Sequence, residues 1–159
     1  MTATDQSSRT ELLNARIRRT NAVYARFHGP LSLLVITLSF FPYYAPEADS
    51  SITYGSLWQE VLVIGRSVDL FALLVLLLTA GLLGLAAIGQ ASVAGLVTVF
   101  TGSIIIGWTL LHSPGYVQPP ALTHFGVVDI VLSFLIAVLA LVHALHLFAL
   151  DLAFQRLTD

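Results

Sequence analysis

The stretch "LFALLVLLLTAGLLGLAAIG", residues 70–89, decides the fold class of this 159-residue chain. It contains no charged side chain, and its length matches the roughly 20 residues that an α-helix needs to cross a bilayer. From residue 70 to residue 150, Asp129 is the only Asp, Glu, Lys or Arg. Overall, 10% of the residues are charged and the mean hydropathy is +0.87, whereas a soluble domain carries about 25% charged residues. The composition therefore predicts an all-α integral membrane protein.

Three further segments have the composition of membrane spans, at residues 31–45, 91–111 and 126–150. Together with a second span over residues 68–89, they predict a four-transmembrane-helix bundle that occupies residues 29–159. The first segment is shorter than a bilayer crossing needs, and a proline near its end is expected to kink or stop the helix. External loops are expected before the second span and before the fourth.

Residues 1–28 are predicted to form a polar, basic N-terminal segment. Within it, residues 10–27 place apolar side chains at roughly helical spacing, and most of the arginines lie off that face. Such a basic amphipathic juxtamembrane segment can lie in the lipid headgroup layer, and a solvated basic tail is the alternative. The tripeptide "HGP", residues 28–30, is expected to break the helix before the first span.

The distribution of arginine predicts the orientation. Five arginines precede the first span and one follows the fourth, whereas only Arg66 falls in an external loop. The positive-inside rule therefore places both termini in the cytoplasm, with the chain in a plasma or inner membrane. The chain has no lysine, which indicates a prokaryotic composition bias.

The histidines are the first candidates for chemistry. His143 and His146 share one face of the fourth span near its cytoplasmic end, and His28 can approach them if the first and fourth spans are neighbours. These three side chains could hold a haem or a transition metal, and His112 and His124, which flank the second external loop, could hold a metal. Because two histidines on one helix face cannot clamp a haem from both sides, we favour interhelical hydrogen bonds or a placement at the membrane interface, and expect no cofactor.

Two carboxylates are the second candidates. Asp69 and Asp129 are each expected in the first turn of a helix that runs from outside to inside, where a negative charge complements the helix dipole. Arg66 can neutralise Asp69, and Thr123 can cap the fourth span. The alternative is that the two acids line a path for a cation or a proton. We favour the capping interpretation.

Small residues along the second and third spans predict close helix packing, because lipid supplies no hydrophobic force between helices. The glycines expected at such contacts are Gly81, Gly84, Gly95, Gly102 and Gly107. The same faces could instead dock a partner subunit or a second copy of this chain.

Three classes of function remain open. The sequence contains no nucleotide-binding loop and no hydrolase or metalloprotease motif, it has no cysteine for a thiolate-bound metal, and its net charge of −2 gives no reason to expect nucleic acid as a partner. We expect a non-catalytic accessory or scaffold subunit of a larger membrane complex, surrounded by lipid and by partner membrane subunits. The alternatives are a redox or metal-binding subunit and a small oligomeric transporter or channel.

Overall fold

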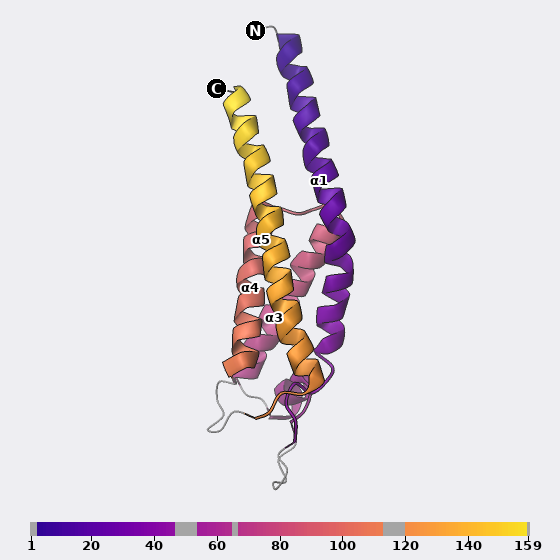
Figure 1. Ribbon diagram of the computed structural model, residues 1–159, viewed down its shortest axis with the longest axis vertical. Helices are drawn as coiled ribbons and strands as arrows, with labels where there is room; N and C mark the ends of the chain where they lie inside the picture. Colours follow the sequence, from indigo (N-terminus) through magenta and orange to yellow (C-terminus); the bar gives the residue numbers. More distant parts are fainter. Residues whose placement is uncertain (1–2, 47–53, 65–66, 113–119, 159) are drawn as a thin grey trace.

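The computed structural model describes residues 3–46, 54–64, 67–112 and 120–158. Four long helices and a short helical segment account for most of these residues, and no β-strand occurs among them. The elements in chain order are α1 (Ala3–Leu38), α2 (Leu57–Gln59), the π-helical turn η1 (Glu60–Ile64), α3 (Ser67–Ala87), α4 (Val93–His112) and α5 (His124–Thr158). Both chain termini lie at one end of the bundle, here called the terminal end, and the connections after α1 and before α5 lie at the opposite, loop end (Figure 1).

Three stretches of the described helices are long and apolar enough to cross a membrane: Asp69–Ala87, Val93–His112 and His124–Gln155. This finding confirms an all-helical, multi-pass membrane protein, although four such helices were predicted. The helix that falls short is α1, because only residues 27–38 lie between Arg26 and its end. At 1.5 Å per residue this apolar part is about 18 Å long, against about 30 Å of hydrocarbon.

The structure corrects the prediction for α1 at two places. The tripeptide at residues 28–30 does not break the helix, which continues through Pro30 and ends at Leu38 instead of residue 45. A proline removes one backbone hydrogen bond, a loss that packing on the neighbouring helix offsets. On α3, Ala80 accepts a 2.8 Å hydrogen bond at its carbonyl oxygen from the Ser32 hydroxyl, two residues after the proline.

The segment after α1 forms a strap across the loop end. Residues 42–45, here called the outer strap, run antiparallel to residues 121–123. The Thr123 amide donates to the Tyr43 carbonyl at 2.9 Å, and the Ala45 amide donates to the Ala121 carbonyl at 2.7 Å. The Thr123 hydroxyl also accepts from the Gly126 amide at 3.1 Å, which confirms this threonine as the cap of α5.

The four long helices form a ring in which α1 packs on α3 and α5, and α4 packs on the same two helices. The core consists of aliphatic side chains from all four, among them Val35, Leu76, Leu83, Leu96, Val99, Ile136 and Ala140. Most of the exposed large side chains on these helices are also aliphatic or aromatic, as expected where lipid covers the outer surface. The predicted turn between the second and third spans is present, and Gly89 takes a φ of 82° there, which favours glycine.

The predicted packing glycines differ in what surrounds them. A Cβ added at Gly102 would lie 2.4 Å from the Thr79 hydroxyl oxygen, and one at Gly107 would lie 3.3 Å from the Phe134 ring, so both sit at close helix contacts. At Gly84 the nearest atom would be 3.9 Å away, and at Gly95 it belongs to a serine near the start of the same helix. Gly81 meets open space, so its absent side chain is not needed for packing in this chain.

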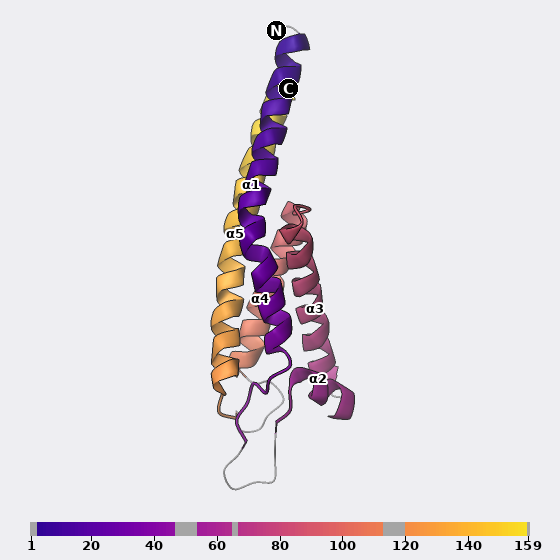
Figure 2. The same cartoon turned by 90° about the vertical axis from the view of Figure 1, so that its right-hand side faces the viewer.

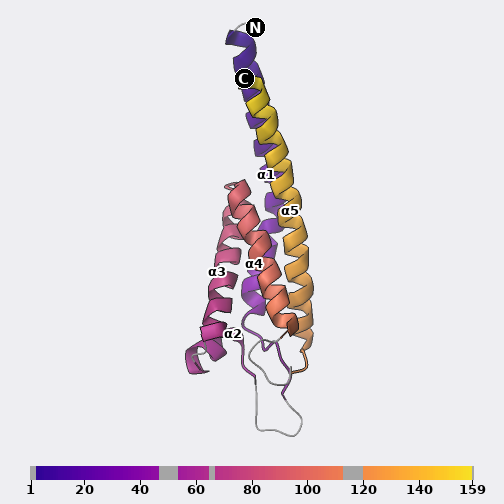
Figure 3. The ribbon, with the colours of Figure 1, turned by 90° about the vertical axis from the view of Figure 1, so that its left-hand side faces the viewer.

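At the terminal end, α1 and α5 continue together past the turn between α3 and α4 (Figure 2, Figure 3). Asn21 lies level with that turn, because its amide nitrogen is 3.5 Å from the Gly89 carbonyl oxygen. Residues 3–20 of α1 and 147–158 of α5 therefore form a two-helix projection, here called the arm. Leu13 is only 8% exposed, although it lies within this projection.

Candidate functional site

Helices α1 and α5 bring two of the predicted histidines into contact. His28 Nε2 lies 3.0 Å from His143 Nδ1, and both side chains are fully buried. On its other side, His143 Nε2 lies 3.0 Å from the Asn21 side-chain oxygen. Since Asn21 also reaches the α3–α4 turn, the contact lies where the arm meets the bundle.

Tyr24 and His146 complete the group. The Tyr24 hydroxyl is 2.7 Å from His146 Nδ1, and the Tyr24 ring stacks on the His143 ring with centroids 4.1 Å apart. We call Asn21, Tyr24, His28, His143 and His146 the histidine cluster. Asn21 and Tyr24 were not sequence candidates, although they share one face of α1 with His28 at helical spacing.

The hydrogen-bond partners determine where the protons lie. Asn21 directs its NH₂ group to the Gly89 carbonyl, so its oxygen accepts a hydrogen bond from the N–H at Nε2 of His143. A neutral His143 then accepts at Nδ1 from the N–H at Nε2 of His28. This arrangement leaves the lone pair of His28 Nδ1 buried and without a hydrogen-bond partner among the described residues.

The cluster has the geometry of a hydrogen-bond network. Two imidazole nitrogens on opposite sides of one metal ion lie about 4 Å apart, because each metal–nitrogen bond is about 2 Å long. The 3.0 Å between His28 and His143 is a hydrogen-bond distance instead. Among the described residues, no group of three or more His, Asp or Glu side chains is placed to hold a metal. A haem or metal at these histidines stays a prediction, and it would require the two rings to separate.

The second predicted histidine pair lies at the loop end. His112 is the last residue of α4, and its ring stacks on Trp108 with centroids 3.8 Å apart. His124 is the first residue of α5 and is exposed. A metal shared by these two histidines stays a prediction as well.

The two aspartates occupy different environments. Asp69 lies in the first turn of α3, as predicted, whereas its proposed partner Arg66 lies outside the described residues. Because α5 begins at His124, Asp129 lies beyond the first turn of this helix. The prediction that the helix dipole stabilises its negative charge is therefore wrong. Its side chain is only 1% exposed.

Asp129 lies beside Tyr43 of the outer strap, whose side chain is 6% exposed. Burial raises the pKa of the Tyr43 phenol, and the negative charge of Asp129 raises it further. A side-chain hydrogen bond between the Tyr43 hydroxyl and the Asp129 carboxylate links the outer strap to α5 and also raises the pKa of Tyr43.

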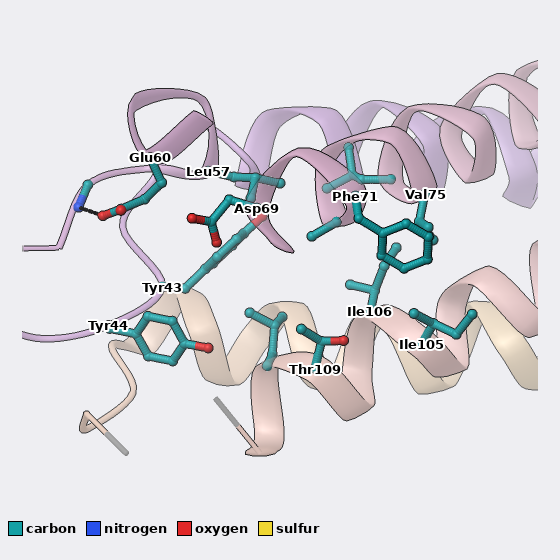
Figure 4. A pocket seen from close by; sticks show the side chains of 14 residues that line it. Tyr43, Tyr44, Leu57, Glu60, Asp69, Phe71, Val75, Ile105, Ile106 and Thr109 are labelled. Carbon is teal, nitrogen blue, oxygen red and sulfur yellow. Dashed lines mark hydrogen bonds between the residues drawn. The ribbon is translucent and has the colours of Figure 1, made fainter. Parts of the chain in front are cut away.

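The loop end also contains a cavity of about 120 Å³ (Figure 4). Tyr43, Tyr44, Glu60 and Asp69 supply its polar wall. Glu60 was not a sequence candidate, because a single acid in a loop gives no signal of burial before the fold is known.

Comparison with protein-family models, with curated proteins and with solved structures finds no match for this chain. Its function is therefore inferred from its residues and their geometry.

Proposed function

We propose that this chain is a non-catalytic subunit of a larger membrane complex, and that its arm docks the partner. The observation that carries this proposal is the arm itself. In the arm, α1 and α5 extend beyond the level at which α3 and α4 end, so these parts of the two helices do not pack on α3 or α4 (Figure 2).

We infer that α1 supplies a fourth crossing, which places both termini in the cytoplasm. Gly29 approaches Ala87 of α3 closely, and Ser32 bonds to the Ala80 carbonyl, so α1 lies alongside a membrane-spanning helix. From Asn21 to Leu38, α1 is about 26 Å long, close to the thickness of the hydrocarbon core. Hydrogen bonds within the histidine cluster pair most of the polar side chains that this longer segment buries.

The outward face of α1 has the composition of a protein interface. Within the arm, Leu12 is 63% exposed, and Arg16 and Arg19 are exposed on the same helix face. These three residues are here called the arm stripe. Arginine side chains are enriched at protein interfaces. The matching partner surface is an apolar helix that carries acidic side chains.

Two neighbouring arginines test this proposal. Arg19 lies on the arm stripe, and Arg18 is also exposed but points away from it. We expect Arg19→Glu to lower the yield of a larger complex in mild detergent about tenfold, which corresponds to about 1.4 kcal/mol of affinity, and Arg18→Glu to change it much less. The measurement is the size and composition of the purified complex. A wild-type chain that migrates alone under these conditions would contradict the proposal, as would equal losses in the two variants.

A further inference from the structure

A notch lies at the terminal end of the bundle, where α1 passes the turn between α3 and α4 (Figure 2). At its inner end the two helices touch, because a Cβ added at Gly29 of α1 would lie 3.5 Å from the Cβ of Ala87 on α3. On one side the notch is bounded by Asn21, whose amide nitrogen lies 3.5 Å from the Gly89 carbonyl oxygen. The notch is therefore closed at these two places and opens outward past exposed residues.

Small side chains keep this notch open. Ala22 and Ala25 line it from α1, and Ala87 lines it from α3. Its volume is about 390 Å³. Because an apolar cavity of about 150 Å³ accepts the six carbon atoms of benzene, this notch accepts a group of about 15 non-hydrogen atoms. A phosphate joined to two glycerol units, as in the headgroup region of a phosphatidylglycerol, is of this size.

The notch lies at the depth of lipid headgroups. The apolar stretch of α3 ends at Ala87 and that of α4 begins at Val93, so the turn between them lies at the boundary of the hydrocarbon layer. Asn21 is level with this turn, and Arg18 lies three residues, or about 4.5 Å, further out along α1. Since the headgroup layer on each side of a bilayer is about 5–7 Å thick, Arg18 is placed at the level of the lipid phosphates.

The charge of the notch favours an anion. Arg18 is exposed, lines the notch and forms no ion pair with any described residue, and none of the described lining residues is acidic. The end of α3 repels an anion only weakly, because its last carbonyl groups are already hydrogen-bonded. The Gly89 amide donates to the Ala86 carbonyl at 3.1 Å, and the Gln90 amide donates to the Leu85 carbonyl at 3.0 Å.

An apolar surface continues from the notch along α3 toward the middle of the membrane. Ile88 borders the notch and is 69% exposed. Leu85 and Gly81 follow it inward at helical spacing, and the position of the absent Gly81 side chain is open space. A lipid whose headgroup lies in the notch can place its acyl chains along this surface, whereas a free phosphate ion gains nothing from it.

We propose that this notch is a binding site for an anionic glycerophospholipid. The Arg18 guanidinium binds the lipid phosphate, the headgroup rests against Ala22 and Ala25, and the acyl chains lie along α3. Such a lipid braces the base of the arm against the α3–α4 turn. Because Arg18 lies off the arm stripe, the site does not depend on partner docking.

Phosphatidylglycerol and phosphatidylcholine with the same acyl chains are the matched probes, because both contain a phosphate but only the first has a net negative charge. Native mass spectrometry of the full chain in detergent, titrated with each lipid, measures the number of bound lipids and their affinity. We expect one phosphatidylglycerol to bind about fivefold more tightly than phosphatidylcholine, which corresponds to about 1 kcal/mol. Equal affinities, or no lipid retained on folded protein, would overturn the proposal and leave Arg18 to the acidic side chains of a protein.

Two arginines of the arm connect this binding to the notch. Arg18→Gln removes the charge of the notch, and we expect it to fold and to weaken phosphatidylglycerol binding about fivefold, because the side chain is exposed. Arg16→Gln is the matched control, since Arg16 is also exposed but lies on the opposite side of the helix, and it should leave the affinity unchanged. Equal losses in the two variants would show a general attraction of the lipid to the basic arm and overturn the proposal.

A third variant tests the shape of the site. Ala22→Leu fills the notch while every charge is kept, and it should fold, because the position is exposed and leucine favours a helix. We expect it to weaken phosphatidylglycerol binding at least fivefold, with circular dichroism confirming that each variant retains its helices. Full binding to Ala22→Leu would show that the lipid does not enter the notch, and this result would also overturn the proposal.

Discussion

At the scale of single residues, the histidine cluster shows how a pair of helices is joined by polar groups in an apolar bundle. His143 occupies its centre, with one ring nitrogen directed at His28 and the other at Asn21. Buried polar groups of this kind contribute little net stability while paired but are costly once a partner is lost. The centre of the network is therefore its most sensitive position.

Replacing His143 with leucine should destabilise the protein by about 2–4 kcal/mol, because the change leaves two buried polar groups without partners. The free energy of unfolding, measured in a denaturing-detergent titration followed by circular dichroism, tests this expectation. His124→Leu is the matched control, since that histidine is exposed. A His143→Leu protein as stable as the wild type would show that the network does not hold α1 on α5.

Tyr43 gives a prediction about pH. Its pKa is raised in the folded protein from an ordinary value of 10.0, so the folded state retains the phenolic proton more tightly than the unfolded state does. The resulting stability is complete below pH 10 and is lost as the pH rises above it, by up to about 1.4 kcal/mol per pH unit. Tyr43→Phe lacks this contribution. Unfolding titrations between pH 8 and pH 11 should therefore show a steeper decline in the wild type than in the variant, and parallel profiles would contradict this account.

At the scale of elements, the sequence identified helices well where an apolar run has clear limits. The spans predicted at residues 68–89 and 91–111 end within two residues of α3 and α4. The prediction for α1 was wrong, because contacts with α3 override the local helix-breaking preferences of glycine and proline at residues 29–30. A local sequence pattern does not reveal such contacts. The approach of His28 to His143 was predicted only on the condition that the first and fourth spans are neighbours. The outer strap and its cavity depend on pairing between residues about 80 positions apart, which one sequence does not reveal.

The contact between α3 and α4 depends on one glycine. Gly102→Ala would place a methyl group 2.4 Å from the Thr79 hydroxyl oxygen, and separating the helices should cost about 1–3 kcal/mol of unfolding free energy. Gly81→Ala is the matched control, because its methyl group meets open space and should be neutral or stabilising by up to about 1 kcal/mol. The double variant Gly102→Ala/Thr79→Ala should recover part of the loss. Equal effects at the two glycines would rule out this close contact.

At the scale of the whole molecule, the number of crossings decides how the chain is oriented. Because the chain has no cysteine, single cysteines introduced at exposed positions report their side of the membrane without background. With four crossings, Glu11→Cys and Gln90→Cys should react with an impermeant thiol reagent from the same side, and Ala121→Cys from the other. Labelling of Glu11→Cys from the same side as Ala121→Cys would show that α1 does not cross.

The pairing of the first helix with the last has a consequence for biosynthesis. His28 finds its partner His143 115 residues later in the chain. At about 5–20 residues per second, α1 waits roughly 6 to 23 seconds after its own synthesis before that partner exists. During this interval its buried asparagine and histidine have no α5 to bond with, and its apolar part is too short to enter lipid readily alone. With four crossings, helix α1 would therefore depend on α3 for early insertion, and the final arrangement of the bundle is completed only when the last helix arrives.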